Sequence, residues 1–68
     1  MKGMTIRLER VKRGTTQAEL AEKLGVSQVL ISKLERGIYM ASKETSSRIR
    51  RIFRQIDENG KGNEERKV

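Results

Sequence analysis

Two short segments of this chain carry the signals of an α-helix, and only three residues separate them. The first begins at a capping box, in which the hydroxyl of Thr16 and the carboxylate of Glu19 each accept a backbone N–H of the other residue, and it ends at Gly25. The second begins after Ser27, a favourable N-cap, and ends at Gly37. Because this connection is too short for comfortable antiparallel packing, we expect the two helices to cross at a steep angle.

The pair is expected to cover residues 17–24 and 28–36, and two further helices are expected over residues 5–13 and 42–56. No segment has the pattern of a β-strand, so the sequence predicts an all-α domain of four helices over residues 1–56. Residues 57–68 are polar and charged, and we expect them to form a disordered tail. The apolar residues of the four helices are Ile6, Leu8, Val11, Leu20, Ala21, Leu24, Ile31, Leu34, Ile49, Ile52, Phe53 and Ile56.

The net charge is the most informative part of the composition. The chain has 68 residues and a formal net charge of +7, which favours a polyanion as partner. It has no cysteine and no histidine, which excludes disulfides and argues against a zinc finger. With no nucleophile–base pair, metal-ligand cluster or phosphate loop, we expect no enzymatic activity, no catalytic residue, no metal and no cofactor. No apolar run is long enough to span a bilayer, and we expect a cytoplasmic protein, associated with the nucleoid if its polyanion partner is the chromosome.

The central segment meets the requirements of a helix-turn-helix. Ala21 is small where the two helices touch, and Gly25 can take the positive φ of the turn. The run TQAELAEKLGVSQVLISKLERG, residues 16–37, resembles the lambda-repressor-like family, also called the Xre or Cro type. The resemblance extends over about residues 5–56. It implies a small four-helix domain that binds double-stranded DNA, with the helix over residues 28–36 in the major groove.

One face of that helix is expected to read bases. At 100° per residue, Gln28, Val29, Ser32 and Lys33 form one stripe opposite Ile31. The resemblance implies that Gln28 is the principal base reader, and a glutamine amide matches adenine N6 and N7; the alternative is contact with phosphate alone. Val29 contacts a thymine methyl or packs on the preceding helix. Ser32 bonds a base edge or keeps the surface small, and Lys33 contacts guanine or a phosphate.

Other residues are expected to bind the DNA backbone. The resemblance implies that Gln17, at a helix N-terminus suited to anions, holds a phosphate and also bonds Gln28; the alternative is a plain helix-forming residue. The arginines of the last helix are interpreted mainly as a solvated face. Phosphate contacts, which position the domain without reading sequence, are implied for Arg36, Tyr39 and Lys43, and more weakly for Arg7 and Arg13.

The resemblance also implies a structural ion pair between Arg10 and Glu35, which would tie the first helix to the recognition helix; the alternative is two independent surface charges. The chain departs from the family pattern at Ala41, where proline is common, and at Ser46 and Ser47, where apolar residues are preferred. No fifth helix is visible after residue 56. The candidates for an apolar patch that a partner covers are Phe53 and Ile56, with Ile38 or Met40.

These features favour a bacterial or phage transcriptional regulator, more often a repressor, that binds a palindromic operator as a homodimer. Three alternatives are open. The chain could be an antitoxin whose tail or last helix binds a toxin, or a protein-interaction module on the same fold, and an antagonist or toxin protein is the partner that these two imply. The third, a basic amphipathic membrane binder, is the least favoured because the apolar stripe of the last helix is needed for the core.

Overall fold

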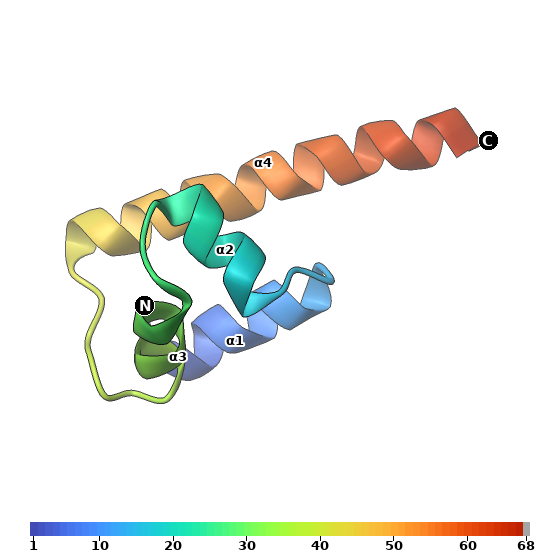
Figure 1. The fold of residues 1–68 in the computed structure, drawn as a ribbon. Coiled ribbons are helices and arrows are strands. Elements are labelled where there is room, and N and C mark those ends of the chain that lie inside the picture. The colour runs from blue at the N-terminus through green and yellow to red at the C-terminus, as the bar shows by residue number, and fades with distance from the viewer. Residues whose placement is uncertain (68) are drawn as a thin grey trace.

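Four helices make up the fold. The computed structural model describes the backbone of residues 1–67 and the side chains of residues 1–59. The helices are α1 (Gly3–Lys12), α2 (Gln17–Leu24), α3 (Gln28–Glu35) and α4 (Lys43–Lys67), and no strand occurs in the described backbone. In Figure 1, α4 runs along the top, α2 crosses between α4 and α1, and α3 lies beside α1 on the lower side. The predicted all-α fold of four helices is confirmed.

The bounds of α2 follow directly from its sequence signals. The N–H of Glu19 donates to Thr16 Oγ1 at 3.0 Å, and the N–H of Thr16 donates to Glu19 Oε1 at 2.9 Å, which completes the capping box. At the other end Gly25 has φ +78°, a left-handed conformation that costs glycine no steric penalty. The helix therefore covers residues 17–24, as its sequence predicts.

The other helices differ from the predicted bounds by a residue or two at most of their ends. α1 covers residues 3–12 rather than 5–13, and α3 ends at Glu35, with Arg36 as its C-cap. α4 begins at Lys43 because Ser42 serves as a cap, its Oγ accepting the N–H of Thr45 at 3.1 Å.

The larger difference is at the end of α4, which continues past the predicted end at residue 56 to Lys67. Asp57, the first residue of the predicted tail, accepts two hydrogen bonds from Arg13 at 2.8 and 2.9 Å, so its side chain is anchored to the domain. No proline stops the helix at this point. For residues 60–67 only the helical backbone is described, and Val68 lies outside the described residues.

The core lies where the inner faces of the four helices meet. α1 contributes only Ile6, whereas Leu8 and Val11 remain exposed. Phe53, proposed above as part of an exposed patch, is instead buried in the core, and Ile56 is half-buried against it. The buried apolar residues are Ile6, Leu20, Ala21, Leu24, Ile31, Leu34, Ile49, Ile52 and Phe53.

Gly3 permits a close approach of α1 to the end of α3. A Cβ atom at this position would lie 2.6 Å from the carbonyl oxygen of Glu35 and closer still to that of Leu34. Both obstacles are backbone atoms, so only a residue without a side chain fits here unless the helices move apart.

Neither a membrane span nor a metal cluster occurs in the part of the chain that the structure describes. No helix there combines the length and the apolar character needed to cross a bilayer. No group of three or more His, Cys, Asp or Glu side chains in the same part could hold a metal ion.

Candidate nucleic-acid interface

The corner between α2 and α3 is held by hydrogen bonds to backbone carbonyls. The N–H groups of Gly25 and Val26 both donate to the carbonyl of Ala21, at 2.8 and 3.0 Å. The carbonyl of Leu24 accepts a hydrogen bond from the guanidinium of Arg48, on α4, at 2.6 Å. These bonds use carbonyls that the end of a helix leaves without intrahelical partners. The direction in which α3 leaves the turn is therefore fixed both locally and by α4.

The first turn of α3 presents side chains to solvent. Ser27 Oγ accepts the N–H of Leu30 at 3.2 Å, which caps the helix. Gln28 follows directly and is exposed, and Val29 is 62% exposed. Ile31, on the other side of the helix, is completely buried. α3 is thus held by its inner side, and its first two residues protrude.

The other two predicted base readers lie closer to the protein. Ser32 and Lys33 are half-buried. The ammonium of Lys33 lies 5.4 Å from the centroid of the Tyr39 ring, a cation–π arrangement. Tyr39 itself is 50% exposed, so this pair borders the protruding edge without forming part of its tip.

Arg10 and Glu35 are in direct contact, in two parallel hydrogen bonds. Arg10 Nε donates to Glu35 Oε2 at 2.6 Å, and Nη2 donates to Oε1 at 3.0 Å. Their side chains are only 12% and 3% exposed, so water screens the pair weakly. Arg10 Nη1 also donates to the carbonyl of Thr15 at 2.9 Å. The hydrogen bond to Glu35 raises the pKa of Arg10 above its ordinary value.

Gln17 lies in the same network. Its Nε2 donates to Glu35 Oε1 at 3.1 Å. The family resemblance implied that Gln17 bonds Gln28. Among the described residues, the Gln17 amide instead bonds the carboxylate of Glu35. The carboxylate of Glu35 thus joins α3 to α1 through Arg10 and to the start of α2 through Gln17.

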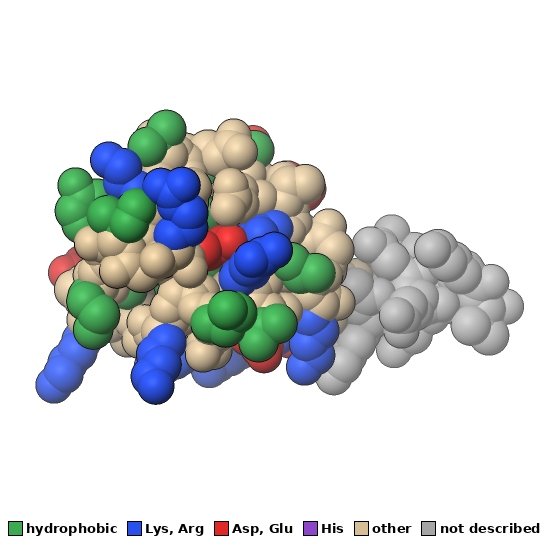
Figure 2. Space-filling model, turned by 90° about the horizontal axis from the view of Figure 1, so that it is seen from below, with side chains coloured by type: hydrophobic (Ala, Val, Ile, Leu, Met, Phe, Trp, Pro, Cys, Tyr) green, Lys and Arg blue, Asp and Glu red, His purple; other side chains and the backbone are tan. Residues whose placement is uncertain are grey.

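The three predicted phosphate contacts after α3 are all accessible. Arg36 and Lys43 are exposed, at the C-cap of α3 and the first residue of α4, and Tyr39 lies in the loop between them. The surface seen from below the view of Figure 1 shows many Lys and Arg side chains and few acidic ones (Figure 2).

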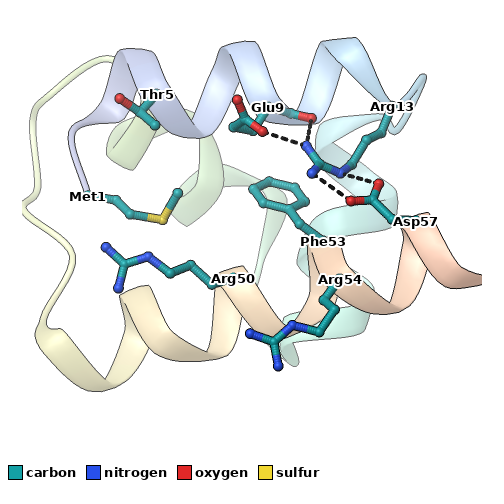
Figure 3. Close-up of a pocket in the computed structure, with 8 residues that line it drawn as sticks. All are labelled: Met1, Thr5, Glu9, Arg13, Arg50, Phe53, Arg54 and Asp57. Carbon is teal, nitrogen blue, oxygen red and sulfur yellow. Dashed lines mark hydrogen bonds and ion pairs between the residues drawn. The ribbon is translucent and has the colours of Figure 1, made fainter.

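Arg13, predicted as a weak phosphate contact, is used inside the fold (Figure 3). Its guanidinium donates to Asp57 at 2.8 and 2.9 Å and to Glu9 Oε1 at 2.8 Å, and it lies 4.7 Å from the centroid of the Phe53 ring. The hydrogen bonds to Asp57 and Glu9 raise the pKa of Arg13, and the bond from Arg13 lowers the pKa of Glu9. The structure thus gives Arg13 a role within the fold, and the phosphate contact implied for it stays a prediction.

Several residues that shape the site carry no distinctive sequence signal. Thr15 is buried and supplies a carbonyl to Arg10, and Arg48 fastens the end of α2. Ser46, a departure from the family pattern, is buried, and its Oγ accepts a hydrogen bond from the α-amino group of Met1 at 3.1 Å. The partners of these residues are 5 to 45 positions away in the sequence, so pattern alone does not identify them.

Comparison with known proteins adds one finding. A family model described as helix-turn-helix matches residues 6–60, most of the chain. The match includes the corner, the protruding edge of α3 and the Arg10–Glu35 pair. No curated protein and no solved structure matches the chain at a significant level.

Proposed function

The chain belongs to the lambda-repressor-like helix-turn-helix family of DNA-binding regulators, and from this premise we propose that it is a repressor that binds a palindromic duplex operator as a homodimer. The observation that carries the proposal is the protruding start of α3, with Gln28 and Val29 exposed on a helix whose other side is buried. A helix presented in this way fits the major groove of B-DNA.

In the proposed complex, Gln28 bonds adenine N6 and N7 with one donor and one acceptor, and Val29 contacts a thymine methyl. The exposure of Val29 supports this role over packing on α2. Ser32, half-buried one turn later, bonds a base edge. Lys33 lies against Tyr39, which favours a contact between Lys33 and a phosphate or a guanine at the border of the groove over a contact at the centre of the groove.

Backbone contacts would come from both ends of the motif. Lys43, Arg36 and Tyr39 supply a cationic and hydroxyl-bearing flank, which holds phosphates without reading sequence. At the start of α2 we propose a phosphate held by those N–H groups of the first helical turn that the capping box does not use. The side-chain amide of Gln17 is already bonded to Glu35, so in this proposal Gln17 contributes its place at the start of the helix rather than its amide.

A homodimer requires a self-complementary surface, and the loop after α3 offers one. Ile38 is 55% exposed and Met40 is 86% exposed, next to a groove that Leu30, Tyr39 and Thr45 help to line. With Phe53 in the core, we propose these loop residues in its place as the dimer contact.

In vitro selection from random duplexes tests the proposal, because a recovered motif reveals both the sequence preference and its symmetry. On the selected site, Gln28→Ala should weaken binding by about 1–3 kcal/mol and relax the choice at one base pair, measured by fluorescence anisotropy. Gln55→Ala, the same change on an exposed face of α4, is the matched control. Equal losses on selected and random duplexes would contradict base reading, and one protein molecule per selected duplex would contradict the homodimer.

A further inference from the structure

Large apolar side chains that remain at least half exposed fall into two groups in the described part of the chain. Four lie in α3 and the loop after it, next to the proposed DNA and dimer contacts. The other three lie on α1, which contributes no base contact to the proposed interface. The first group is Val29, Ile38, Tyr39 and Met40, and the second is Met4, Leu8 and Val11.

The three residues on α1 form a continuous stripe. Met4, Leu8 and Val11 are spaced four and three residues apart, which places them within about 60° of one another around the helix. They are 61%, 60% and 57% exposed, whereas Ile6, on roughly the opposite side, is completely buried. Single exposed apolar residues are ordinary, but a row of three on one face marks an interaction surface. We call Met4, Leu8 and Val11 the α1 stripe.

The borders of the α1 stripe are basic. By the same angular spacing Arg7 lies on one side and Lys12 on the other, and both are exposed. Neither forms an ion pair within the described residues. The only acidic residue of α1, Glu9, lies beyond Lys12 as seen from the stripe, is half-exposed and is bonded to Arg13. Figure 2 shows the lower face, to which α1 belongs, with hydrophobic side chains among Lys and Arg side chains.

Because both borders of the α1 stripe carry positive charge, they discriminate between the possible binding partners. If the α1 stripes of two copies packed together, Arg7 and Lys12 of one copy would lie beside basic residues of the other in either helix direction, and like charges would repel. A helix with acidic residues on both sides of its apolar face would instead pair with both borders.

We propose that the α1 stripe is the docking surface for an acidic amphipathic helix of a partner protein. The partner places an apolar row against Met4, Leu8 and Val11, and its Asp or Glu side chains meet Arg7 and Lys12. This surface is separate from the base-reading edge of α3. It therefore gives the regulator a second binding activity that does not depend on which operator it reads.

The test uses the full chain, labelled with ¹⁵N, and two synthetic helical peptides. One has leucines at positions i, i+4 and i+7 flanked by glutamates, and the other has lysines in place of the glutamates. We expect the acidic peptide to bind, with NMR shift changes centred on the α1 stripe, and to weaken as salt rises. Leu8→Ser should weaken this binding at least tenfold, whereas Val29→Ser, at an equally exposed apolar residue outside the stripe, should leave it unchanged.

Several results would overturn the proposal. They are equal binding of the lysine peptide, shift changes centred on α3, or equal effects of Leu8→Ser and Val29→Ser. If sedimentation shows self-association that Leu8→Ser abolishes, the stripe binds a second copy instead. If the protein binds anionic vesicles and Leu8→Ser abolishes this binding, the stripe binds a lipid surface instead. Leu8→Ser should keep its affinity for the selected duplex, so loss of peptide binding and failure of the DNA-binding function are distinguishable.

Discussion

The bonds among Arg10, Glu35 and Gln17 lead to a prediction about stability. In Arg10→Met, the carboxylate of Glu35 loses both of its arginine hydrogen bonds and keeps only the amide of Gln17. A hydrogen bond to a charged group contributes about 1.5–3 kcal/mol, and breaking a buried pair costs about 3–5 kcal/mol. Because the Arg10 side chain is 12% exposed and not fully enclosed, we expect a loss near the lower limit, about 3 kcal/mol.

A loss of this size is a large part of the free energy of unfolding, which for a domain of this length is about 3–10 kcal/mol. Urea unfolding followed by circular dichroism measures it. With an m-value of about 1–1.5 kcal/mol/M, the midpoint should fall by roughly 2–3 M. Arg7→Met, which removes an exposed arginine from the same helix, is the matched control and should change stability by less than about 0.5 kcal/mol.

The double variant Arg10→Met with Glu35→Leu distinguishes the contribution of the ion pair to stability from the contribution of side-chain packing. It removes both charges, so most of the stability should return even if Arg10→Met alone fails to fold. A loss of under about 1 kcal/mol in Arg10→Met, or a double variant no more stable than Arg10→Met, would refute the inference that this pair is buried and mutually dependent.

Three further outcomes are expected. Lys43→Ala should weaken binding to all duplexes alike and lower the slope of log K against log salt by about one unit; an unchanged slope would remove this lysine from the phosphate contacts. Gly3→Ala should cost about 1–3 kcal/mol, seen as a lower thermal midpoint, because its Cβ meets backbone carbonyls of α3; an unchanged midpoint would show that the helices separate freely. The pKa of Glu19 is lowered by the N–H and hydroxyl of Thr16, so its contribution is present above the ordinary value of 4.5 and is lost as pH falls through the lower folded pKa. Thermal melts of Glu19→Gln should therefore show a smaller decline on acidification than those of the wild type, and identical declines would contradict the capping role.

The central part of the fold was predictable because its signals are local. The capping box at Thr16 and the glycine at residue 25 act within a few residues of themselves, and the structure shows both in the expected conformations. The apolar spacing of α2 and α3 similarly identifies their inner sides, Leu20 and Ile31 among them.

The residues whose surroundings could not be predicted depend on distant parts of the chain. Arg13 resembled a surface cation because Asp57, its partner, is 44 positions away. For the same reason Phe53 resembled an exposed residue, although Arg13 lies over its ring. The close approach at Gly3 is set by the position of α3 and has no counterpart in the local sequence. Angular spacing alone likewise did not show that Lys33 lies against Tyr39.

The bond between Arg13 and Asp57 bears on the order in which the domain assembles. It closes a segment of 44 residues, whereas the bond between Gln17 and Glu35 closes only 18. The entropic cost of closure grows as (3/2)RT times the logarithm of the segment length, so the ratio of 44 to 18 residues favours the shorter closure by about 0.8 kcal/mol. The crossed pair α2 and α3 is therefore expected to form early during folding, and the last helix to dock afterwards and add Ile49, Ile52 and Phe53 to the core.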